Sequence, residues 1–309
     1  MGVLRARARK PIRILVLGFP YFVDRLRELG QSREFVFLAM PQGFFRRWWT
    51  LFRTDVIYLI GGDLRPNRYY GIALLWRKKI IMHWVGSDIL EMKKIKENGG
   101  FLFPPFIKQI THWAEVDWTA AELAGLGVSA RVVPLTPAGY PENVKDLPAK
   151  FVALSYLPPG KEDFYGAPWV MRLAADFPEI VFLIAAASPQ DKKDQWPENM
   201  IPIGWVNDMS ELYGEITVLI RLTQHDGLSF MVLEALAQAR HVIWSYPLPG
   251  AGRARDYQEL REQIETLYQE FQDGKLVPNW RGREAVTLEY GPPAVWERIR
   301  AGITALLAE

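Results

Sequence analysis

The sequence predicts an α/β protein with two doubly wound, Rossmann-like domains, each a parallel sheet covered by helices on both faces. Short apolar, β-branched runs alternate with longer amphipathic segments along all 309 residues, which is typical of buried parallel strands joined by crossover helices. The length exceeds what one hydrophobic core ordinarily supports. Three prolines and a glycine lie within residues 136–148, which favours a connector there. We therefore expect one domain over residues 1–140, a second over 149–290 and a final helix over 293–309.

Each apolar run predicts a strand, and each amphipathic segment between two runs predicts a helix. The first half has predicted strands at 12–17, 35–38, 56–60, 79–83, 116–119 and 131–133, and predicted helices at 21–29, 68–76, 89–97, 105–113 and 119–126. The second half has predicted strands at 151–155, 180–185, 201–203, 216–220 and 241–244, and predicted helices at 169–177, 209–213, 230–239, 255–271 and 294–307. Ligands of such sheets bind beyond the carboxyl ends of the strands, so we expect the site there.

Composition excludes several classes of chemistry. The chain has no cysteine, which excludes a disulfide scaffold, thiolate-held zinc, an iron–sulfur cluster and a cysteine nucleophile. It also lacks a three-glycine dinucleotide fingerprint, a Walker A sequence and an Asp-x-Asp motif, and its four histidines are not paired at metal-ligand spacing. The longest apolar run, residues 180–187, is too short to cross a bilayer. We expect a cytoplasmic protein with no nucleic-acid partner.

The charge is distributed unevenly along the chain. Residues 1–148 contain 22 Lys and Arg and 13 Asp and Glu, a net +9, whereas residues 149–309 contain 15 and 22, a net −7. Together these give the +2 of the whole chain. Such polarity indicates different partners for the two domains, with an anionic partner for the basic half.

Residues 218–239 contain most of the functional signal. A buried strand ends near Arg221, a polar loop contains Asp226 and Gly227, and a helix begins near Ser229. Glycine allows close approach of the backbone to a ligand, and a helix N-terminus offers N–H groups with positive partial charge. Arg221 would add a full positive charge. These are the properties that a diphosphate site needs when no metal is present.

Asp226 and Glu234, eight residues apart within the sequence HDGLSFMVLEALA, resemble the acid-x7-acid motif of the retaining glycosyltransferases of the GT-B fold, family 4. The resemblance implies a GT-B arrangement, with the final helix crossing back to the first domain. It also implies a catalytic Asp226 that contacts the donor sugar and a Glu234 that holds the ribose. The backbone N–H groups that would meet sugar and phosphate are those of Gly227, Leu228 and Ser229.

Two further segments of the second half resemble the same family. Residues 203–206, with the helix predicted at 209–213, are similar to its base-binding turn, which implies nucleotide contacts by Gly204 and Trp205. The loop 155–162 is similar to its phosphate-binding loop. Lys161 is present there as a candidate phosphate ligand, but Tyr156 stands where the family has an arginine.

In the first half, the segment from His83 to Asp88 resembles the family's His-x-x-Gly-x-Asp loop. This implies a catalytic His83 near the anomeric region of the sugar, and Gly18 lining the cleft from the first strand–helix turn.

Each of these assignments has a structural alternative. Asp226 could be a helix cap, and His83 could be a hydrogen-bonded core histidine. Lys161 could belong to a solvated ion pair with its acidic neighbours, and Arg221 could pair structurally.

Residues 43–53 contain five aromatic side chains and three arginines. The segment predicts either an interfacial membrane helix or acceptor platform, with Arg46, Arg47 and Arg53 meeting anionic headgroups, or a crossover helix that packs its aromatics on the sheet. A peripheral position on the inner face of the cytoplasmic membrane is therefore an alternative to a purely cytoplasmic one.

The sequence thus predicts a retaining hexosyltransferase that uses a nucleoside diphosphate sugar as donor, with no metal or other cofactor, and an unidentified glycan, lipid-linked or small-molecule acceptor. One alternative is a non-catalytic or weakly active sugar-nucleotide-binding protein of the same fold. Another is a metal phosphohydrolase built on His225 and Asp226.

Overall fold

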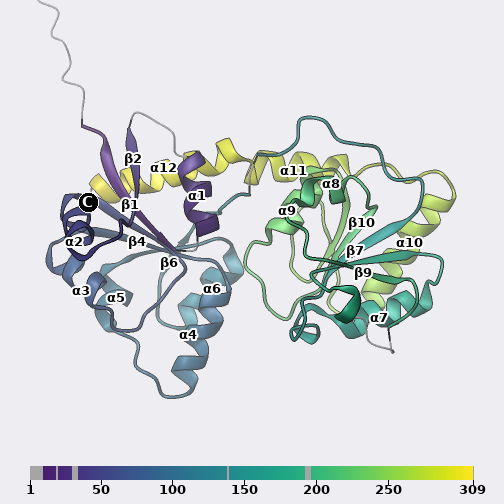
Figure 1. Ribbon diagram of the computed structural model, residues 1–309, viewed down its shortest axis with the longest axis horizontal. Helices are drawn as coiled ribbons and strands as arrows, with labels where there is room; N and C mark the ends of the chain where they lie inside the picture. Colours follow the sequence, from purple (N-terminus) through teal and green to yellow (C-terminus); the bar gives the residue numbers. More distant parts are fainter. Residues whose placement is uncertain (1–9, 19, 30–33, 138, 192–195, 309) are drawn as a thin grey trace, which may run out of the picture. The chain divides into compact units, whose positions relative to one another are not determined.

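The computed structural model describes residues 10–18, 20–29, 34–137, 139–191 and 196–308. The chain forms two compact units, Met1–Thr136 with Pro292–Glu309, and Pro137–Gly291. Each unit contains a six-stranded sheet in which every described strand pair is parallel. The predicted fold class, two doubly wound parallel-sheet domains, is confirmed (Figure 1).

The sheet of the first unit has the strand order β2-β1-β3-β4-β5-β6. Its strands are β1 (Ile12–Gly18), β2 (Phe35–Ala39), β3 (Val56–Ile60), β4 (Lys79–Trp84), β5 (Thr111–Ala114) and β6 (Ala130–Val132). All five residues of β3 are buried, because this central strand is paired on both edges and covered on both faces.

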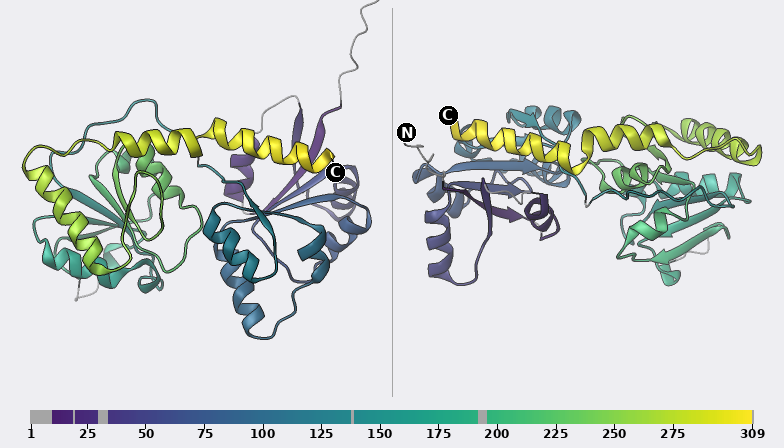
Figure 2. Two further views of the ribbon diagram at one scale, coloured as in Figure 1. Left: turned by 180° about the vertical axis from the view of Figure 1, so that it is seen from behind. Right: turned by 90° about the horizontal axis from the view of Figure 1, so that it is seen from above.

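Seven helices are described in the first unit. They are α1 (Pro20–Leu29), α2 (Phe44–Arg53), α3 (Arg68–Leu75), α4 (Ser87–Glu97), α5 (Pro104–Gln109), α6 (Asp117–Gly125) and α12 (Pro292–Ala308). Figure 2 shows α12, in yellow, running alongside the first sheet. Trp296 contacts Phe35 and Phe37 edge-on, and a Cβ at Gly302 would lie 2.5 Å from the Trp113 ring. These contacts show that α12 completes the core of the first unit.

The sheet of the second unit has the strand order β12-β11-β10-β7-β8-β9. Its strands are β7 (Val152–Tyr156), β8 (Val181–Ala185), β9 (Met200–Gly204), β10 (Val218–Arg221), β11 (His241–Trp244) and β12 (Gly252–Arg253). The helices are α7 (Ala167–Asp176), α8 (Met209–Tyr213), α9 (Phe230–Ala237), α10 (Tyr257–Gln272) and α11 (Trp280–Tyr290), with 3₁₀ turns at Asp163–Tyr165 and Pro189–Asp191.

Two predicted elements are wrong, and one helix was missed. The helix predicted at 105–113 ends at Gln109, because Ile110 adopts extended backbone angles (φ −99°, ψ 141°) and the chain enters β5. The strand predicted at 116–119 is the extended N-cap residue Val116 followed by the first turn of α6. Helix α11 contains two arginines and two glutamates and buries only Gly282 and Val286, so its sequence lacks the apolar period that marks the other helices.

Helix α2 packs one of its five aromatic side chains, the half-buried Trp48, against the core of the first unit and leaves the other four exposed. Leu51 is its only buried residue, whereas Phe44, Phe45, Trp49 and Phe52 are 60–85% exposed. The interpretation of this segment as a helix with its aromatics in the core is therefore wrong for these four residues.

Candidate active site

The predicted donor site lies at the carboxyl ends of three adjacent strands of the second unit. Arg221, the last residue of β10, pairs in register with Trp244 of β11. One position earlier, Ile220 pairs with Ser155 of β7, which brings Tyr156 to the same edge. The chain order of the strands reverses here, since β10 lies directly beside β7. Ligands of doubly wound sheets bind at such a switch point.

Arg221 and Asp226 form a largely buried ion pair at this edge. The Nε atom of Arg221 donates to Oδ2 of Asp226 over 2.8 Å, and the side chains are 12% and 16% exposed. The guanidinium also lies over two tyrosine rings, 5.9 Å from the centroid of Tyr156 and 5.4 Å from that of Tyr165. The arginine is thus held by one carboxylate and two aromatic faces.

Burial and the ion pair shift the pKa values of Arg221 and Tyr156. Burial acts to lower the pKa of Arg221, but the charge and hydrogen bond of Asp226 outweigh burial, so the pKa is raised. Burial raises the pKa of Tyr156, and the nearby Arg221 opposes this only partly. Arg221 is therefore charged and Tyr156 neutral at physiological pH.

Helix α9 begins directly after this ion pair, and Ser229 is its N-cap residue. Ser229 is 5% exposed, makes no side-chain cap bond, and its Oγ has no hydrogen-bond partner within the described part of the chain. A buried hydroxyl without a partner costs free energy. The hydroxyl lies beside the first N–H groups of a helix, where donors of this kind can bind an anion.

Glu234 lies one turn into α9, and Oε2 accepts a hydrogen bond of 2.8 Å from the hydroxyl of Tyr213. Tyr213 is 1% exposed and ends α8. Sequence reasoning did not single out Tyr213 or Tyr165, although both lie inside or next to segments that resemble nucleotide-binding loops. Their contacts with Glu234 and Arg221 join residues that are 21 and 56 positions apart.

The remaining predicted residues of the second unit lie in loops at the same edge of the sheet. Gly204 ends β9 with φ +74°, and a Cβ at this position would meet no atom within 4 Å. Trp205 is 71% exposed, and its Nε1 donates to Asn207. Lys161, in the loop after β7, is exposed and forms no ion pair within the described part of the chain. Gly227 and Leu228 are buried in the loop before α9.

Gly18 and His83 belong to the first unit. Gly18 has φ +140°, and a Cβ there would lie 2.2 Å from the carbonyl oxygen of Ile60, so glycine is required for strand packing. His83 is fully buried. Its Nε2 donates to the carbonyl oxygen of Val133 (2.8 Å), which leaves Nδ1 as acceptor for the Tyr58 hydroxyl (2.7 Å). Burial lowers the pKa of His83 to about 3. This is the geometry of a hydrogen-bonded core histidine, and contact with a sugar would require exchange of one of these bonds.

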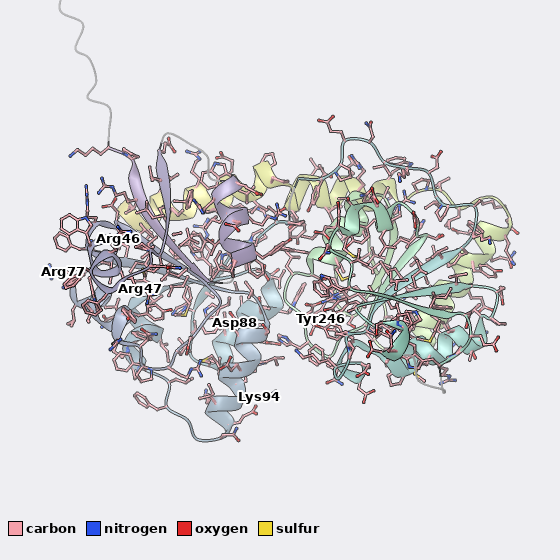
Figure 3. All side chains as sticks on the ribbon, in the orientation of Figure 1. Arg46, Arg47, Arg77, Asp88, Lys94 and Tyr246 are labelled. Carbon is pink, nitrogen blue, oxygen red and sulfur yellow. The ribbon has the colours of Figure 1, made fainter. Side chains whose placement is uncertain are left out.

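Asp88, which follows β4, organises two loops of the first unit. Its carboxylate accepts hydrogen bonds from the backbone N–H groups of Gly62 (2.5 Å), Gly86 (2.9 Å) and Ile89 (2.9 Å). Burial raises the pKa of Asp88, and these hydrogen bonds oppose that effect. The side chain therefore fixes the loop after β3 against the start of α4 (labelled in Figure 3).

A cavity of about 490 Å³ opens beside the Asp226 loop in the second unit. Its lining residues include Trp169, Thr223, Ser245, Tyr246 and Arg253. The backbone N–H of Asp226 donates to the Tyr246 hydroxyl over 3.3 Å, so this tyrosine joins the cavity to the loop. No group of three or more His, Asp or Glu side chains suited to a metal ion occurs among the described residues.

No protein-family profile and no curated protein matches the chain by sequence. Solved structures do match. A mutant of Staphylococcus aureus TarM, in complex with fondaparinux, α-GlcNAc-glycerol and UDP, superposes with a TM-score of 0.58 at 10% identity over 79% of this chain and 55% of TarM. The chain thus spans about half the length of TarM.

Two other structures match over nearly their whole length. Anabaena HepE in complex with UDP and glucose has a TM-score of 0.67 at 11% identity, over 95% of this chain and 99% of HepE. The lipopolysaccharide outer core galactosyltransferase WaaB has a TM-score of 0.64 at 13% identity, over 95% and 99%. The chain has the GT-B fold. A shared fold does not by itself establish an activity, because function depends on the residues of the site.

Proposed function

We propose that this GT-B protein is a retaining glycosyltransferase, similar to family 4, that transfers a hexose from a nucleoside diphosphate sugar without a metal ion. The observation that carries the proposal is the unpartnered, buried hydroxyl of Ser229 at the start of α9. A diphosphate oxygen would accept a hydrogen bond from this hydroxyl and from the first N–H groups of the helix. HepE was solved with UDP and glucose, which supports a sugar-nucleotide ligand for this fold.

The chemical problem in such a transfer is the negative charge that develops on the departing diphosphate. In this proposal, the α9 N-terminus and Ser229 stabilise that charge with dipoles fixed before the reaction begins. Lys161, exposed in the loop after β7, adds a mobile cation. Glu234, held by Tyr213, binds the ribose hydroxyls, and Gly204 and Trp205 form the turn that meets the base.

Asp226 orients the sugar in this scheme. Arg221 does not supply its positive charge to the diphosphate, which is the role predicted for it from the sequence. Because Arg221 is already paired with Asp226 at 2.8 Å, its net charge toward a diphosphate is small. We assign it to positioning the Asp226 carboxylate, with the rings of Tyr156 and Tyr165 fixing the guanidinium. His83 and Gly18 have no direct ligand contact in this proposal, because His83 uses both ring nitrogens within the core of the first unit.

The test compares Ser229→Ala with the wild-type protein in thermal unfolding across UDP, GDP, ADP and CDP. Wild-type protein should be stabilised by at least one of these nucleotides, through mass action. Ser229→Ala should leave the ligand-free midpoint unchanged or raised, because it removes a buried hydroxyl without a partner, and should weaken nucleotide binding about tenfold. Thr304→Ala is the matched control, since that hydroxyl is exposed and donates to the carbonyl oxygen of Arg300 within α12 of the first unit. Absence of any nucleotide shift in the wild type would contradict the proposal.

A second function, a sugar-nucleotide-binding protein without turnover, is favoured by one observation. The ion pair with Arg221 occupies one oxygen of the carboxylate that is proposed to meet the sugar. A panel of nucleotide sugars, scored for binding and for transfer or hydrolysis, separates the two functions. Release of nucleoside diphosphate from the bound donor supports the enzyme, and tight binding without release supports the binder.

A further inference from the structure

The first unit carries an exposed aromatic and basic surface that the donor site does not use. We define it as the aromatic-basic patch, formed by α2 and the corner between α3 and β4. Its exposed apolar members are Phe44, Phe45, Trp49, Phe52, Leu75 and Trp76, with exposed fractions from 42% to 85%. These are six of the sixteen exposed large hydrophobic side chains in the described part of the chain. Such concentration marks an interaction site, since scattered single residues are the norm.

The aromatic rings of the patch form one connected cluster. Trp49 stacks on Phe52 with centroids 6.3 Å apart, and Phe52 meets Trp76 edge-on at 5.9 Å. Trp48 joins both elements, because it contacts Phe44 of α2 and Trp76 beyond α3. The exposed face is therefore continuous over about three turns of α2, roughly 15 Å.

The helix is held in this position by specific contacts. Leu51 is buried, and Nζ of Lys78 donates to the carbonyl oxygens of Phe52 (2.7 Å) and Thr54 (2.6 Å) at the C-terminus of α2. Thr54 itself is buried, and its hydroxyl donates to Thr50 O. The exposed rings thus belong to a fixed helix.

Four exposed arginines surround these rings: Arg46, Arg47, Arg53 and Arg77. Arg53 lies over the Trp49 ring at 5.5 Å, and Arg46, Arg47 and Arg77 lie together at one end of the unit (Figure 3). Neither residues 35–54 nor residues 64–87 contain an Asp or Glu, and no ion pair involves these four arginines within the described part of the chain. The patch is uniformly positive.

We propose that the aromatic-basic patch binds the surface of an anionic lipid bilayer. Aromatic rings are favoured at the boundary between headgroups and acyl chains, and arginines beside them meet the phosphate groups. The charge of the whole unit agrees, because residues 1–136 and 292–309 together contain 23 Lys and Arg and 13 Asp and Glu, a net +10. A protein partner would need a complementary acidic and apolar face, whereas anionic lipid supplies both properties in any orientation. No helix among the described residues is long and apolar enough to span a membrane.

Flotation of the full chain with vesicles of phosphatidylcholine, with or without about one third phosphatidylglycerol, tests the proposal. The wild-type protein should float with the anionic vesicles, and high salt should release it. Arg46→Gln/Arg47→Gln/Arg53→Gln should bind about a hundredfold more weakly, since each arginine contributes about fivefold. Phe45→Ser/Trp49→Ser/Phe52→Ser should also lose binding, even to the vesicles that contain phosphatidylglycerol and although all of its arginines are kept.

Arg131→Gln and Leu288→Ser are the matched controls, since both side chains are exposed and lie outside the patch. All variants should keep the wild-type unfolding midpoint and the nucleotide-induced shift, which separates this proposal from the proposed function. Equal binding to neutral vesicles, or binding that the patch variants do not change, would overturn the proposal. Sedimentation of the lipid-free protein covers the remaining outcome: an oligomer that the aromatic variant dissociates, without vesicle binding, would make the patch an interface between copies.

Discussion

The guanidinium of Arg221 and the carboxylate of Asp226 lie 2.8 Å apart, and both side chains are more than four-fifths buried. Neither charge would be stable alone at this depth, because desolvation of a lone buried ion costs several kcal/mol. This ion pair therefore joins the end of β10 to the loop that precedes α9, and each partner depends on the other for its position.

Removing one partner of the Arg221–Asp226 pair should lower the free energy of unfolding more than removing both partners. We expect Asp226→Ala to lower the free energy of unfolding by about 3–5 kcal/mol, because it leaves a buried guanidinium without its carboxylate. The double variant Arg221→Met/Asp226→Ala should recover about 1–3 kcal/mol of that loss. Urea unfolding measures both values. Glu297→Gln, in an exposed pair with Arg300, is the control and should have little effect. A double variant as unstable as the sum of its parts would show that the two charges act independently.

Gly18 should not tolerate a side chain. Gly18→Ala places a Cβ 2.2 Å from the Ile60 carbonyl oxygen at φ +140°, and backbone strain with displacement of β3 should cost about 3 kcal/mol. Gly71→Ala in α3 is the matched control, since its Cβ meets no atom within 4 Å and its φ is not positive. That variant should be neutral or stabilising by up to about 1 kcal/mol. Similar denaturation curves for the two variants would refute the packing role of Gly18.

His83 should make the first unit less stable in mild acid. Its pKa is about 3 in the folded protein and about 6.5 when unfolded, so only the unfolded state takes up a proton between these values. The contribution of the neutral His83 ring to the free energy of unfolding is complete above pH 6.5 and is lost as the pH falls toward 3. The loss between pH 7 and 5 is about 2 kcal/mol.

The ¹⁵N chemical shifts of the His83 ring should report a neutral imidazole, protonated at Nε2, down to about pH 4. The His83→Gln variant should have a shallower dependence of unfolding free energy on pH than the wild type. A ring that becomes charged near pH 6.5 would mean that the two buried hydrogen bonds do not persist in solution.

Tyr213 should affect donor binding through Glu234. Tyr213→Phe removes the hydroxyl that donates to Glu234, so the carboxylate loses its fixed orientation. Under the proposed function, KM for the nucleotide sugar should rise about fivefold with kcat nearly unchanged. Tyr257→Phe breaks a comparable hydrogen bond to Asp176 on α7 and should change stability without changing KM. An unaltered KM in Tyr213→Phe would remove Glu234 from the ribose site.

The strand-loop-helix unit around α9 could be predicted from sequence because its signals are local. A continuous apolar run ends at Arg221, glycine and polar residues follow, and Ser229 precedes the apolar helix. The helix was expected over 230–239 and ends at Ala237. The helix predicted at 294–307 corresponds to α12, which begins at the paired prolines 292 and 293.

The contacts that define the site chemistry were beyond sequence reasoning. Nothing local to His83 indicates that Tyr58 and Val133, 25 and 50 positions away, take both ring nitrogens. The contacts of Arg221 with the rings of Tyr156 and Tyr165 likewise depend on the pairing of β10 with β7, which joins segments far apart in the sequence. The aromatic face of α2 was ambiguous for a related reason: a strongly amphipathic helix has the same sequence whether its apolar side meets a core or a membrane.

Helix α12 has a consequence for the order in which the protein is made. Trp296 packs against Phe35, and the α12 backbone at Gly302 packs against Trp113. These α12 residues are synthesised roughly two to three hundred residues after their partners. A ribosome therefore delivers every residue of the second unit before it delivers the helix that completes the first. Until then, the nascent first unit exposes the apolar side chains of β2 and β5 that α12 will cover, and such transiently exposed surface favours aggregation.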